Sequence, residues 1–313
     1  MKPEVIILSP MQRSVTEALE GDFVLHDLTA APDRDAMLAE VGPKIRGAIT
    51  NGGHSVQTAT FDRLPNLEMV SSFGVGYDGI DIPYCKARGL KVTNTPDVLN
   101  DAMAEITLGL MISLARKLPQ ADRYTREGKW AANGPYGLTA ELTGKTVGIA
   151  GLGRVGKEIA ARCQAFKMRV VYFGRTKQDF TPYVYYDDLA KMARDCDWLV
   201  NAMPGGAATA KVFDAAVFDA LGPEGYFVNV GRGTTANEAD LIAALQEKRI
   251  AGAALDVFED EPRVPEAFWG MDNVVLSPHQ GSATVKTRWM MGDLVVRNLK
   301  AYFAGQPVLT PIT

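Results

Sequence analysis

The chain has 313 residues, enough for two domains with hydrophobic cores of their own. Its composition, 47% hydrophobic and 22% charged, is that of a globular protein, and its net charge of -4 argues against a nucleic-acid partner. The three cysteines, Cys85, Cys163 and Cys196, lack the spacing of a zinc site, so we predict no metal and a reducing, cytoplasmic location. The N-terminal apolar run at 5–8 is shorter than the apolar region of a signal peptide, and the longest apolar run, at 106–115, is about half the length of a membrane span, which predicts a soluble protein.

Residues 1–98 alternate between strand-like and helix-like segments. The expected strands are mostly continuous apolar runs of the kind found in buried parallel sheets, at 4–9, 23–28, 45–50, 67–73 and 91–94. Segments rich in Ala, Glu and Leu separate them. This pattern predicts an α/β domain with about five parallel strands.

A long helix is expected at 102–128, where apolar residues recur at helical spacing, and it leads from the first domain into the second as a hinge element. Residues 130–142 show neither the helical nor the strand period. They form either a surface loop or an arm at an interface. We favour the arm, because Trp130 and Tyr136 are costly to leave in water.

The alternation resumes at Thr146. Six further strands are expected at 146–150, 169–173, 198–202, 226–230, 251–257 and 273–276, and they match a complete doubly wound nucleotide fold. A final helix at 283–303 follows, and we expect it to return to the first domain. The predicted division is therefore 1–98 plus 284–313 for the first domain and 99–283 for the second.

A glycine-rich turn joins the strand at 146–150 to the next helix. It reads Gly151, Leu152, Gly153, Arg154, Val155, Gly156, which is the spacing GxGxxG. Gly151 permits the tight turn, Gly153 lets a pyrophosphate approach the backbone, and Gly156 lets helix and strand pack closely. Because a strand precedes the motif and another follows the helix, the sequence predicts a dinucleotide site.

The residues after the second strand of this domain indicate which nicotinamide cofactor binds. An NAD site usually has Asp or Glu there, whereas this chain has Gly174, Arg175, Thr176 and Lys177. Arg175 and Lys177 can neutralise a 2′-phosphate and Thr176 can donate a hydrogen bond to it, so we predict NADPH over NADH. The alternative is that the two cations only face solvent.

Three successive strands of the second domain end next to chemically active side chains. Arg232 follows the strand at 226–230, Glu261 the strand at 251–257, and His279 the strand at 273–276. Ligands of open α/β sheets bind at the carboxyl ends of the strands. Reduction of a 2-oxo acid needs an anchor for the carboxylate, a proton donor and a group that favours the protonated donor, and this set supplies all three.

A turn in the first domain is a second candidate for anion binding. The backbone amides of Val75 and Gly76, in the turn that begins at Gly74, can cradle a carboxylate. The alternative is a simple tight turn. Asn51 and Gly52, at the end of a neighbouring strand, are weaker candidates for the same rim.

Four stretches, at 144–156, 229–233, 252–262 and 277–282, resemble the D-isomer-specific 2-hydroxyacid dehydrogenases, with the closest likeness to the glyoxylate/hydroxypyruvate and hydroxyphenylpyruvate reductases. The resemblance implies that Arg232 binds the substrate's carboxylate and carbonyl, that His279 is the acid/base and that Glu261 pairs with it. It also implies that the backbone amides of Val75 and Gly76 donate hydrogen bonds to the substrate carboxylate. The formate dehydrogenases of the family carry glutamine where Glu261 stands, which argues against that branch.

The resemblance further implies two doubly wound parallel-sheet domains, a flavodoxin-like substrate domain and a Rossmann nucleotide domain with a cleft between them. It implies a homodimer formed through the nucleotide domain, with residues 130–142 reaching the partner. Asp256 corresponds to the family residue that holds the carboxamide of the nicotinamide. The remaining expected cofactor contacts are Met203, Pro204, Val230, Gly231, Arg232, His279 and Gly281.

We therefore expect NADPH-dependent reduction of small 2-oxo acids, such as glyoxylate or hydroxypyruvate, to D-2-hydroxy acids. Departures from the family pattern at Met103, Gly205, Gly206 and Gln280 bear on substrate preference and on cofactor fit. One alternative is an aromatic 2-oxo acid or 2-ketogluconate as substrate. A remote one is a binding protein that senses the cofactor without turnover, since fold alone does not exclude it.

Overall fold

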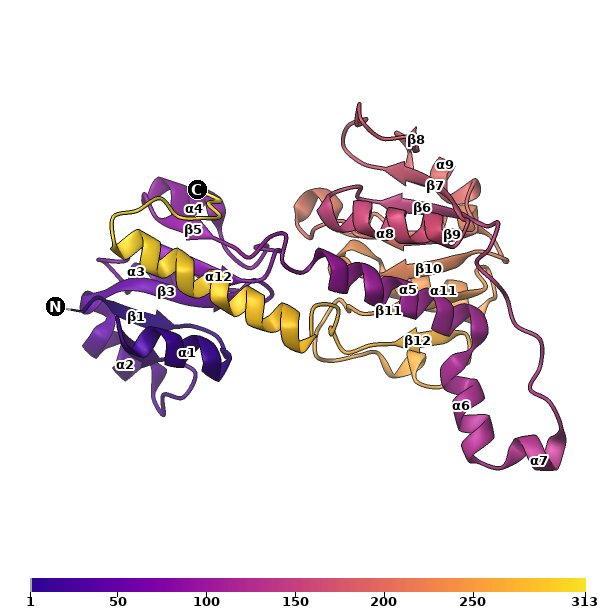
Figure 1. The fold of residues 1–313 in the computed structure, drawn as a ribbon, viewed down its shortest axis with the longest axis horizontal. Coiled ribbons are helices and arrows are strands. Elements are labelled where there is room, and N and C mark those ends of the chain that lie inside the picture. The colour runs from indigo at the N-terminus through magenta and orange to yellow at the C-terminus, as the bar shows by residue number, and fades with distance from the viewer. Residues whose placement is uncertain (1) are drawn as a thin grey trace. The chain divides into compact units, whose positions relative to one another are not determined.

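The computed structural model describes residues 2–313, which form two compact units (Figure 1). The first domain combines the chain up to Leu99 with Ala283–Thr313, and the second domain is Asn100–Ser282. Among the described residues, no helix is both long enough and apolar enough to span a membrane.

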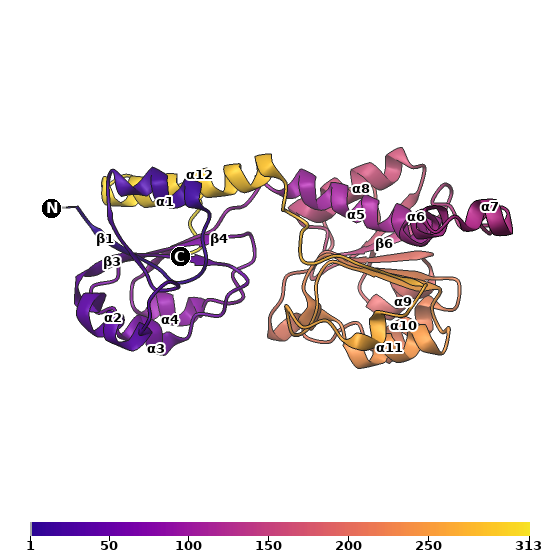
Figure 2. The same cartoon turned by 90° about the horizontal axis from the view of Figure 1, so that it is seen from below.

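The first domain contains a five-stranded parallel sheet in the order β2-β1-β3-β4-β5. This is the flavodoxin-like order, 2-1-3-4-5. Its strands are β1 (Glu4–Ile7), β2 (Val24–Asp27), β3 (Ile45–Asn51), β4 (Met69–Phe73) and β5 (Lys91–Thr93). Its helices are α1 (Arg13–Glu20), α2 (Arg34–Val41), η1 (Gly42–Lys44), α3 (Thr58–Asp62), α4 (Ile82–Ala87) and α12 (Val285–Phe303). Helices α1 and α12 cover one face of the sheet, and α2, α3 and α4 cover the other (Figure 2).

The C-terminal part of the chain completes the first domain. The Phe303 ring of α12 meets Phe23 edge to face, with ring centroids 5.5 Å apart, and Leu299 is fully buried. The tail then runs beside β5, where the amide of Ile312 donates to the carbonyl of Val92 at 2.8 Å and Thr310 Oγ1 donates to the carbonyl of Asn94 at 2.6 Å. The first domain is therefore built from both ends of the chain.

The second domain contains a seven-stranded parallel sheet in the order β12-β11-β10-β9-β6-β7-β8. Its strands are β6 (Thr146–Ala150), β7 (Arg169–Phe173), β8 (Val184–Tyr186), β9 (Trp198–Asn201), β10 (Tyr226–Asn229), β11 (Gly252–Leu255) and β12 (Val274–Leu276). From β6 the chain first builds outward through β7 and β8 and then returns to the other side of β6 at β9. This reversal is the switch point where open α/β sheets bind ligands.

Helices cover both faces of this sheet, with α5 and α8 on one and α9, α10 and α11 on the other (Figure 2). The bounds are α5 (Asn100–Arg116), α6 (Leu118–Arg126), α7 (Lys129–Asn133), α8 (Arg154–Ala165), α9 (Leu189–Arg194), η2 (Ala207–Thr209), α10 (Ala215–Leu221), η3 (Gly233–Thr235), α11 (Glu238–Gln246) and η4 (Glu266–Phe268). A separate cluster of buried side chains fills each layer, and fully buried Trp198 and Phe227 belong to opposite layers. Continuous apolar strands are what a sheet covered on both faces requires.

The expected helix at 102–128 is wrong in its extent, because the chain breaks after Arg116. Lys117 adopts a left-handed conformation, with φ of 49°, and α6 starts at Leu118 with Pro119 in its first turn. Proline lacks an N–H group and clashes with a preceding helical turn, so it begins a new helix here instead of continuing α5. Two short elements were also not predicted, α7 within the segment expected to lack regular structure and the three-residue edge strand β8.

Candidate active site

The glycine-rich loop lies at the switch point, between β6 and α8. Gly151 has a positive φ of 96°, and a Cβ atom on Gly156 would lie 2.1 Å from the carbonyl oxygen of Gly151. Both positions therefore require glycine. A Cβ atom on Gly153 would meet nothing within 4 Å, so this glycine leaves open space in front of the helix.

This loop fits the pyrophosphate of a dinucleotide. Helix α8 begins at Arg154, and its first-turn amides have no acceptor within the helix, so they and the helix dipole favour an anion. Arg154 is exposed, whereas Leu152 is buried against the domain core and Val155 is half-buried. The motif residues thus divide into those that shape the turn and those that border the open side.

The residues expected to recognise the 2′-phosphate follow β7, the strand next to β6. Gly174 is half-buried, and Arg175, Thr176 and Lys177 are exposed. No carboxylate occupies the end of β7, because Phe173 is its last residue. The segment therefore presents two cations and a hydroxyl.

The loop after β9 packs tightly against the loop after β10. A Cβ atom on Gly231 would lie 2.5 Å from the carbonyl oxygen of Met203, so glycine is required there too. Met203 and Val230 are buried, and Pro204 is exposed. Four of the predicted cofactor contacts thus gather at the carboxyl ends of two adjacent strands.

Arg232 sits on a buried network of polar side chains that the sequence analysis missed. Its carbonyl oxygen accepts hydrogen bonds from Asn229 Nδ2 at 3.1 Å and from Thr235 Oγ1 at 2.6 Å. Asn201 Nδ2 donates to Asn229 Oδ1 at 2.8 Å and to Thr235 Oγ1 at 2.6 Å. The amide of Met203 donates to Asn201 Oδ1 at 3.0 Å. The network therefore fixes the Arg232 turn and the Met203 turn together.

A signal for this network was present in the sequence. Asn201 and Asn229 each end an otherwise apolar strand, and the two residues are register partners on β9 and β10. Both side chains are at most 1% exposed. An amide side chain at the same place in two buried strands indicates a mutual hydrogen bond, because a buried polar group needs a partner.

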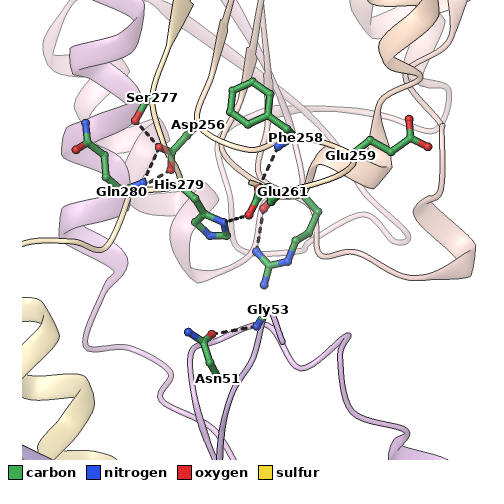
Figure 3. Close-up of polar contacts among 12 residues, drawn as sticks. Asn51, Gly53, Asp256, Phe258, Glu259, Glu261, Ser277, His279 and Gln280 are labelled. Atoms are coloured by element: carbon green, nitrogen blue, oxygen red, sulfur yellow. Dashed lines mark hydrogen bonds and ion pairs between the residues drawn. The ribbon is translucent and has the colours of Figure 1, made fainter. Parts of the chain in front are cut away.

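Asp256 holds the turn that carries His279 (Figure 3). Its fully buried carboxylate accepts from Ser277 Oγ at 2.5 Å and from the amides of Gln280 and Gly281 at 2.9 Å each. The amide of His279 donates to the Asp256 carbonyl at 2.9 Å, and His279 itself has a positive φ of 49°. A strained conformation of this kind persists only where the surroundings fix it.

Glycine is again required at the end of this turn. A Cβ atom on Gly281 would lie 2.6 Å from Met103 Sδ and 2.9 Å from Asp256 Oδ2. Met103, one of the departures from the family pattern, therefore borders the turn, while the neighbouring departure Gln280 is exposed. The role of Asp256 toward a carboxamide stays a prediction.

His279 and Glu261 form a hydrogen-bonded pair, with His279 Nδ1 2.6 Å from Glu261 Oε2 (Figure 3). The other carboxylate oxygen of Glu261 accepts from the amide of Phe258 at 3.0 Å. Both side chains stay partly accessible, His279 at 42% and Glu261 at 33%. Glu261 is thus oriented from its own loop, and it orients the imidazole.

Electrostatics link Arg232 to this pair. Burial by itself raises the pKa of Glu261, but the hydrogen bond and charge of His279, the Phe258 amide and the positive charge of Arg232 together hold that pKa below its ordinary value. The structure thus brings together the three side chains expected at the ends of β10, β11 and β12. Among the described residues, no group of three or more His, Cys, Asp or Glu side chains could hold a metal ion.

The four predicted substrate residues of the first domain lie at the carboxyl edge of its own sheet. A Cβ atom on Gly52 would lie 1.9 Å from the Gly76 carbonyl oxygen, so the loops after β3 and β4 are in backbone contact. The amide of Gly52 donates to the carbonyl of Phe73 at 3.1 Å, and Asn94 Nδ2 donates to the carbonyl of Val75 at 2.9 Å. Asn51 Oδ1 accepts from the amide of Gly53 at 3.1 Å (Figure 3).

Comparison with known proteins agrees with this arrangement. Residues 108–281 match the model of the D-isomer specific 2-hydroxyacid dehydrogenase, NAD binding domain. The chain is 45% identical to glyoxylate/hydroxypyruvate reductase A of Arabidopsis thaliana and 43% identical to hydroxyphenylpyruvate reductase of Plectranthus scutellarioides, with 98% of each chain covered in both cases.

Among solved structures, the chain resembles the NADPH-dependent glyoxylate/hydroxypyruvate reductase of Sinorhizobium meliloti in complex with NADP and malonate. The TM-score is 0.94 at 41% identity, and the match covers 100% of this chain and 97% of the other. A likeness of this extent includes both domains. The chain belongs to the D-isomer-specific 2-hydroxyacid dehydrogenase family.

Proposed function

We propose that the protein reduces small 2-oxo acids, such as glyoxylate and hydroxypyruvate, to D-2-hydroxy acids with NADPH. The observation that carries the proposal is the contact of 2.6 Å between His279 Nδ1 and Glu261 Oε2. The positive charge of Arg232 acts on the same carboxylate and lowers its pKa. A carboxylate only accepts hydrogen bonds, so Nδ1 carries a proton in this pair and Nε2 is the nitrogen available to a substrate.

Each of the three side chains has a distinct task in this proposal. Arg232 binds the substrate's carboxylate and polarises its carbonyl through the planar guanidinium. His279 donates the proton that the carbonyl oxygen gains, and Glu261 stabilises the imidazolium from which it comes. When bound, the reduced nicotinamide supplies the hydride for the carbonyl carbon. The imidazole then regains its proton from water.

NADPH is proposed over NADH because of the segment after β7. Arg175 and Lys177 supply positive charge for a 2′-phosphate, Thr176 supplies a hydroxyl donor, and the acidic residue of an NAD site is replaced. The relative from Sinorhizobium meliloti is itself an NADPH-dependent enzyme. In the first domain, we propose that the amides of Val75 and Gly76 bind the substrate carboxylate, with Asn51 and Gly52 beside them.

The test is a panel of 2-oxo acids assayed with each cofactor. Glyoxylate, hydroxypyruvate, phenylpyruvate, hydroxyphenylpyruvate and 2-ketogluconate are each offered with NADPH and with NADH. We expect the highest kcat/KM for glyoxylate or hydroxypyruvate with NADPH. A higher value for an aromatic acid or for 2-ketogluconate would reassign the substrate, and cofactor binding without turnover of any acid would favour a binding protein.

We also propose a cytoplasmic homodimer. The chain from α6 to Leu138 projects from the layers of the second domain (Figure 1), and it carries Trp130 and Leu138 with exposed fractions of 64% and 103%. Large apolar side chains on a projecting segment suit a second copy of this chain. Light scattering on the purified protein should give a molar mass of twice the chain mass. The double substitution Trp130→Ser with Leu138→Ser should lower the molar mass toward that of one chain.

A further inference from the structure

The short segment Gly174 to Gln178 is hydrogen-bonded to the domain at both ends, while the side chains of residues 175–177 are exposed. At one end, Tyr185 Oη donates to the carbonyl of Gly174 at 3.1 Å. At the other, the amide of Gln178 donates to Tyr172 Oη at 2.8 Å. Tyr172 is 1% exposed, so this attachment point belongs to the core of the domain.

Gln178 makes a third attachment, and this one reaches the glycine-rich loop. Its side-chain Nε2 donates to the carbonyl of Leu152 at 2.7 Å. Leu152 is the second residue of the GxGxxG turn and is buried. One side chain thus joins the turn that fits a pyrophosphate to the segment that presents Arg175 and Lys177.

The hydrogen bond from Gln178 to Leu152 matters for NADPH because this cofactor carries two anionic groups close together. The pyrophosphate and the 2′-phosphate sit on the same adenosine ribose, so a protein that grips both must hold its two anion-binding loops at one fixed separation. A loop that is already ordered before binding costs less conformational entropy to engage than a mobile one. Glutamine also suits the position because it donates a hydrogen bond without adding a negative charge next to a phosphate.

We propose that Gln178 is a positioning residue for the 2′-phosphate, which raises the affinity for NADPH relative to NADH by fixing the segment at 174–178 against the glycine-rich loop. The inference rests on the proposed preference for NADPH. It does not require Gln178 to touch the cofactor. NADH lacks the phosphate that the segment would grip, so its binding depends less on the link.

Calorimetric titration with NADPH and with NADH tests the inference on the wild-type protein and on Gln178→Met. Methionine keeps the length of the side chain and removes the donor. We expect the Kd for NADPH to rise about fivefold and the Kd for NADH to change less than about twofold, as for the loss of one neutral hydrogen bond. Gln178→Glu, which also adds a negative charge, should raise the Kd for NADPH further and provides an independent second variant.

Tyr183→Phe is the matched control. The hydroxyl of Tyr183 donates to Gln164 Oε1 at 2.9 Å, in the same region of the domain but bound to neither loop. Its removal should leave both Kd values unchanged. The thermal midpoint of each variant identifies any general loss of structure.

The outcomes separate the two claims. Wild-type protein that binds NADH as tightly as NADPH overturns the proposed cofactor preference, and this inference with it. Wild-type protein that prefers NADPH, with Gln178→Met retaining the full ratio of the two Kd values, overturns only the role of Gln178. If both variants lose the same affinity for NADPH and for NADH, Gln178 supports only the glycine-rich loop. That result would also overturn the proposed role of Gln178 toward the 2′-phosphate.

Discussion

Asn201 and Asn229 stand opposite each other on β9 and β10, and their fully buried side chains share a hydrogen bond of 2.8 Å. Through Asn229 Nδ2 and Thr235 Oγ1 this pair supports the backbone of Arg232. The position of the proposed anchor therefore depends on side chains that no substrate can reach. Catalytic groups generally need such support, because a small displacement lowers the rate strongly.

Replacing Thr235 with valine should weaken both the fold and the substrate site. The hydroxyl donates to the carbonyl of Arg232 and accepts from Asn201, so its loss removes two buried hydrogen bonds, at a cost of about 1–3 kcal/mol, while Asn229 remains a partner of both groups. Urea denaturation measures that loss, and the KM for glyoxylate should rise. Thr235→Ser keeps the hydroxyl and serves as control; equal KM values for the two variants would contradict the link to Arg232.

Removal of the His279 imidazole should abolish most of the turnover. We expect His279→Ala to lower kcat by about 10²- to 10⁴-fold, because the proposed proton donor for the carbonyl oxygen is lost. Steady-state kinetics with NADPH and glyoxylate measure the change. The exposed neighbour substitution Gln280→Ala should retain kcat within a few-fold, and a His279→Ala enzyme with near-normal kcat would remove the imidazole from the mechanism.

A charge-conserving change at Arg232 should separate geometry from charge. Lysine keeps the positive charge but loses the planar fork that binds a carboxylate through two parallel hydrogen bonds. We expect Arg232→Lys to lower kcat/KM for glyoxylate by at least about tenfold, as for the loss of one charged hydrogen bond. Equal kcat/KM values for wild type and variant would show that charge alone suffices.

The pairing of Glu261 with His279 predicts a pH-dependent contribution to stability. The pKa of Glu261 is lower in the folded protein than its ordinary value of 4.5, so its contribution is present above that value and is lost as the pH falls through the folded-state pKa. Because the pair is partly exposed, we expect at most about 1 kcal/mol. Denaturation of wild type and Glu261→Gln between pH 7 and about pH 3 should show the difference shrinking with acid; a difference that grows with acid would reverse the sign.

Alanine at two glycines of the GxGxxG motif should affect different properties, cofactor binding at Gly153 and stability at Gly156. Gly153→Ala places a methyl group in open space, so the free energy of unfolding should change by less than about 0.5 kcal/mol while the Kd for NADPH rises. Gly156→Ala places it against the Gly151 carbonyl and should destabilise the domain by about 1–3 kcal/mol. Calorimetry and urea denaturation measure the two effects, and tight NADPH binding by Gly153→Ala would contradict the proposed approach of the pyrophosphate.

The sequence predicted the parallel sheets well because buried strands show as continuous apolar runs, such as the segment that became β6. The grouping of Arg232, Glu261 and His279 could also be predicted, since sheet topology alone brings the three strand ends to one edge. The break at Lys117 was missed because the apolar period continues across it. Pro119, two residues further on, was the available signal.

The support around the site was harder to predict from the sequence. Asn201, Thr235 and Gln178 act through hydrogen bonds between segments far apart in the chain, and their partners depend on how the strands align. A hydrophobic pattern contains no information on such contacts. Only the repeated asparagine at two strand ends was a hint, and it acquires meaning once β9 and β10 are known to be neighbours.

Helix α12 belongs to the first domain but is made after the whole of the second. During synthesis, Asn100–Ser282 can therefore reach its native state as a continuous piece of chain, while β1 to β5 still lack one of the two helices that cover one face of their sheet. Until α12 and the segment up to Ile312 have been made, the apolar surface under Leu299 and Phe303 stays uncovered. The first domain is thus the last to finish folding, which exposes it to chaperones and proteases for the longest time.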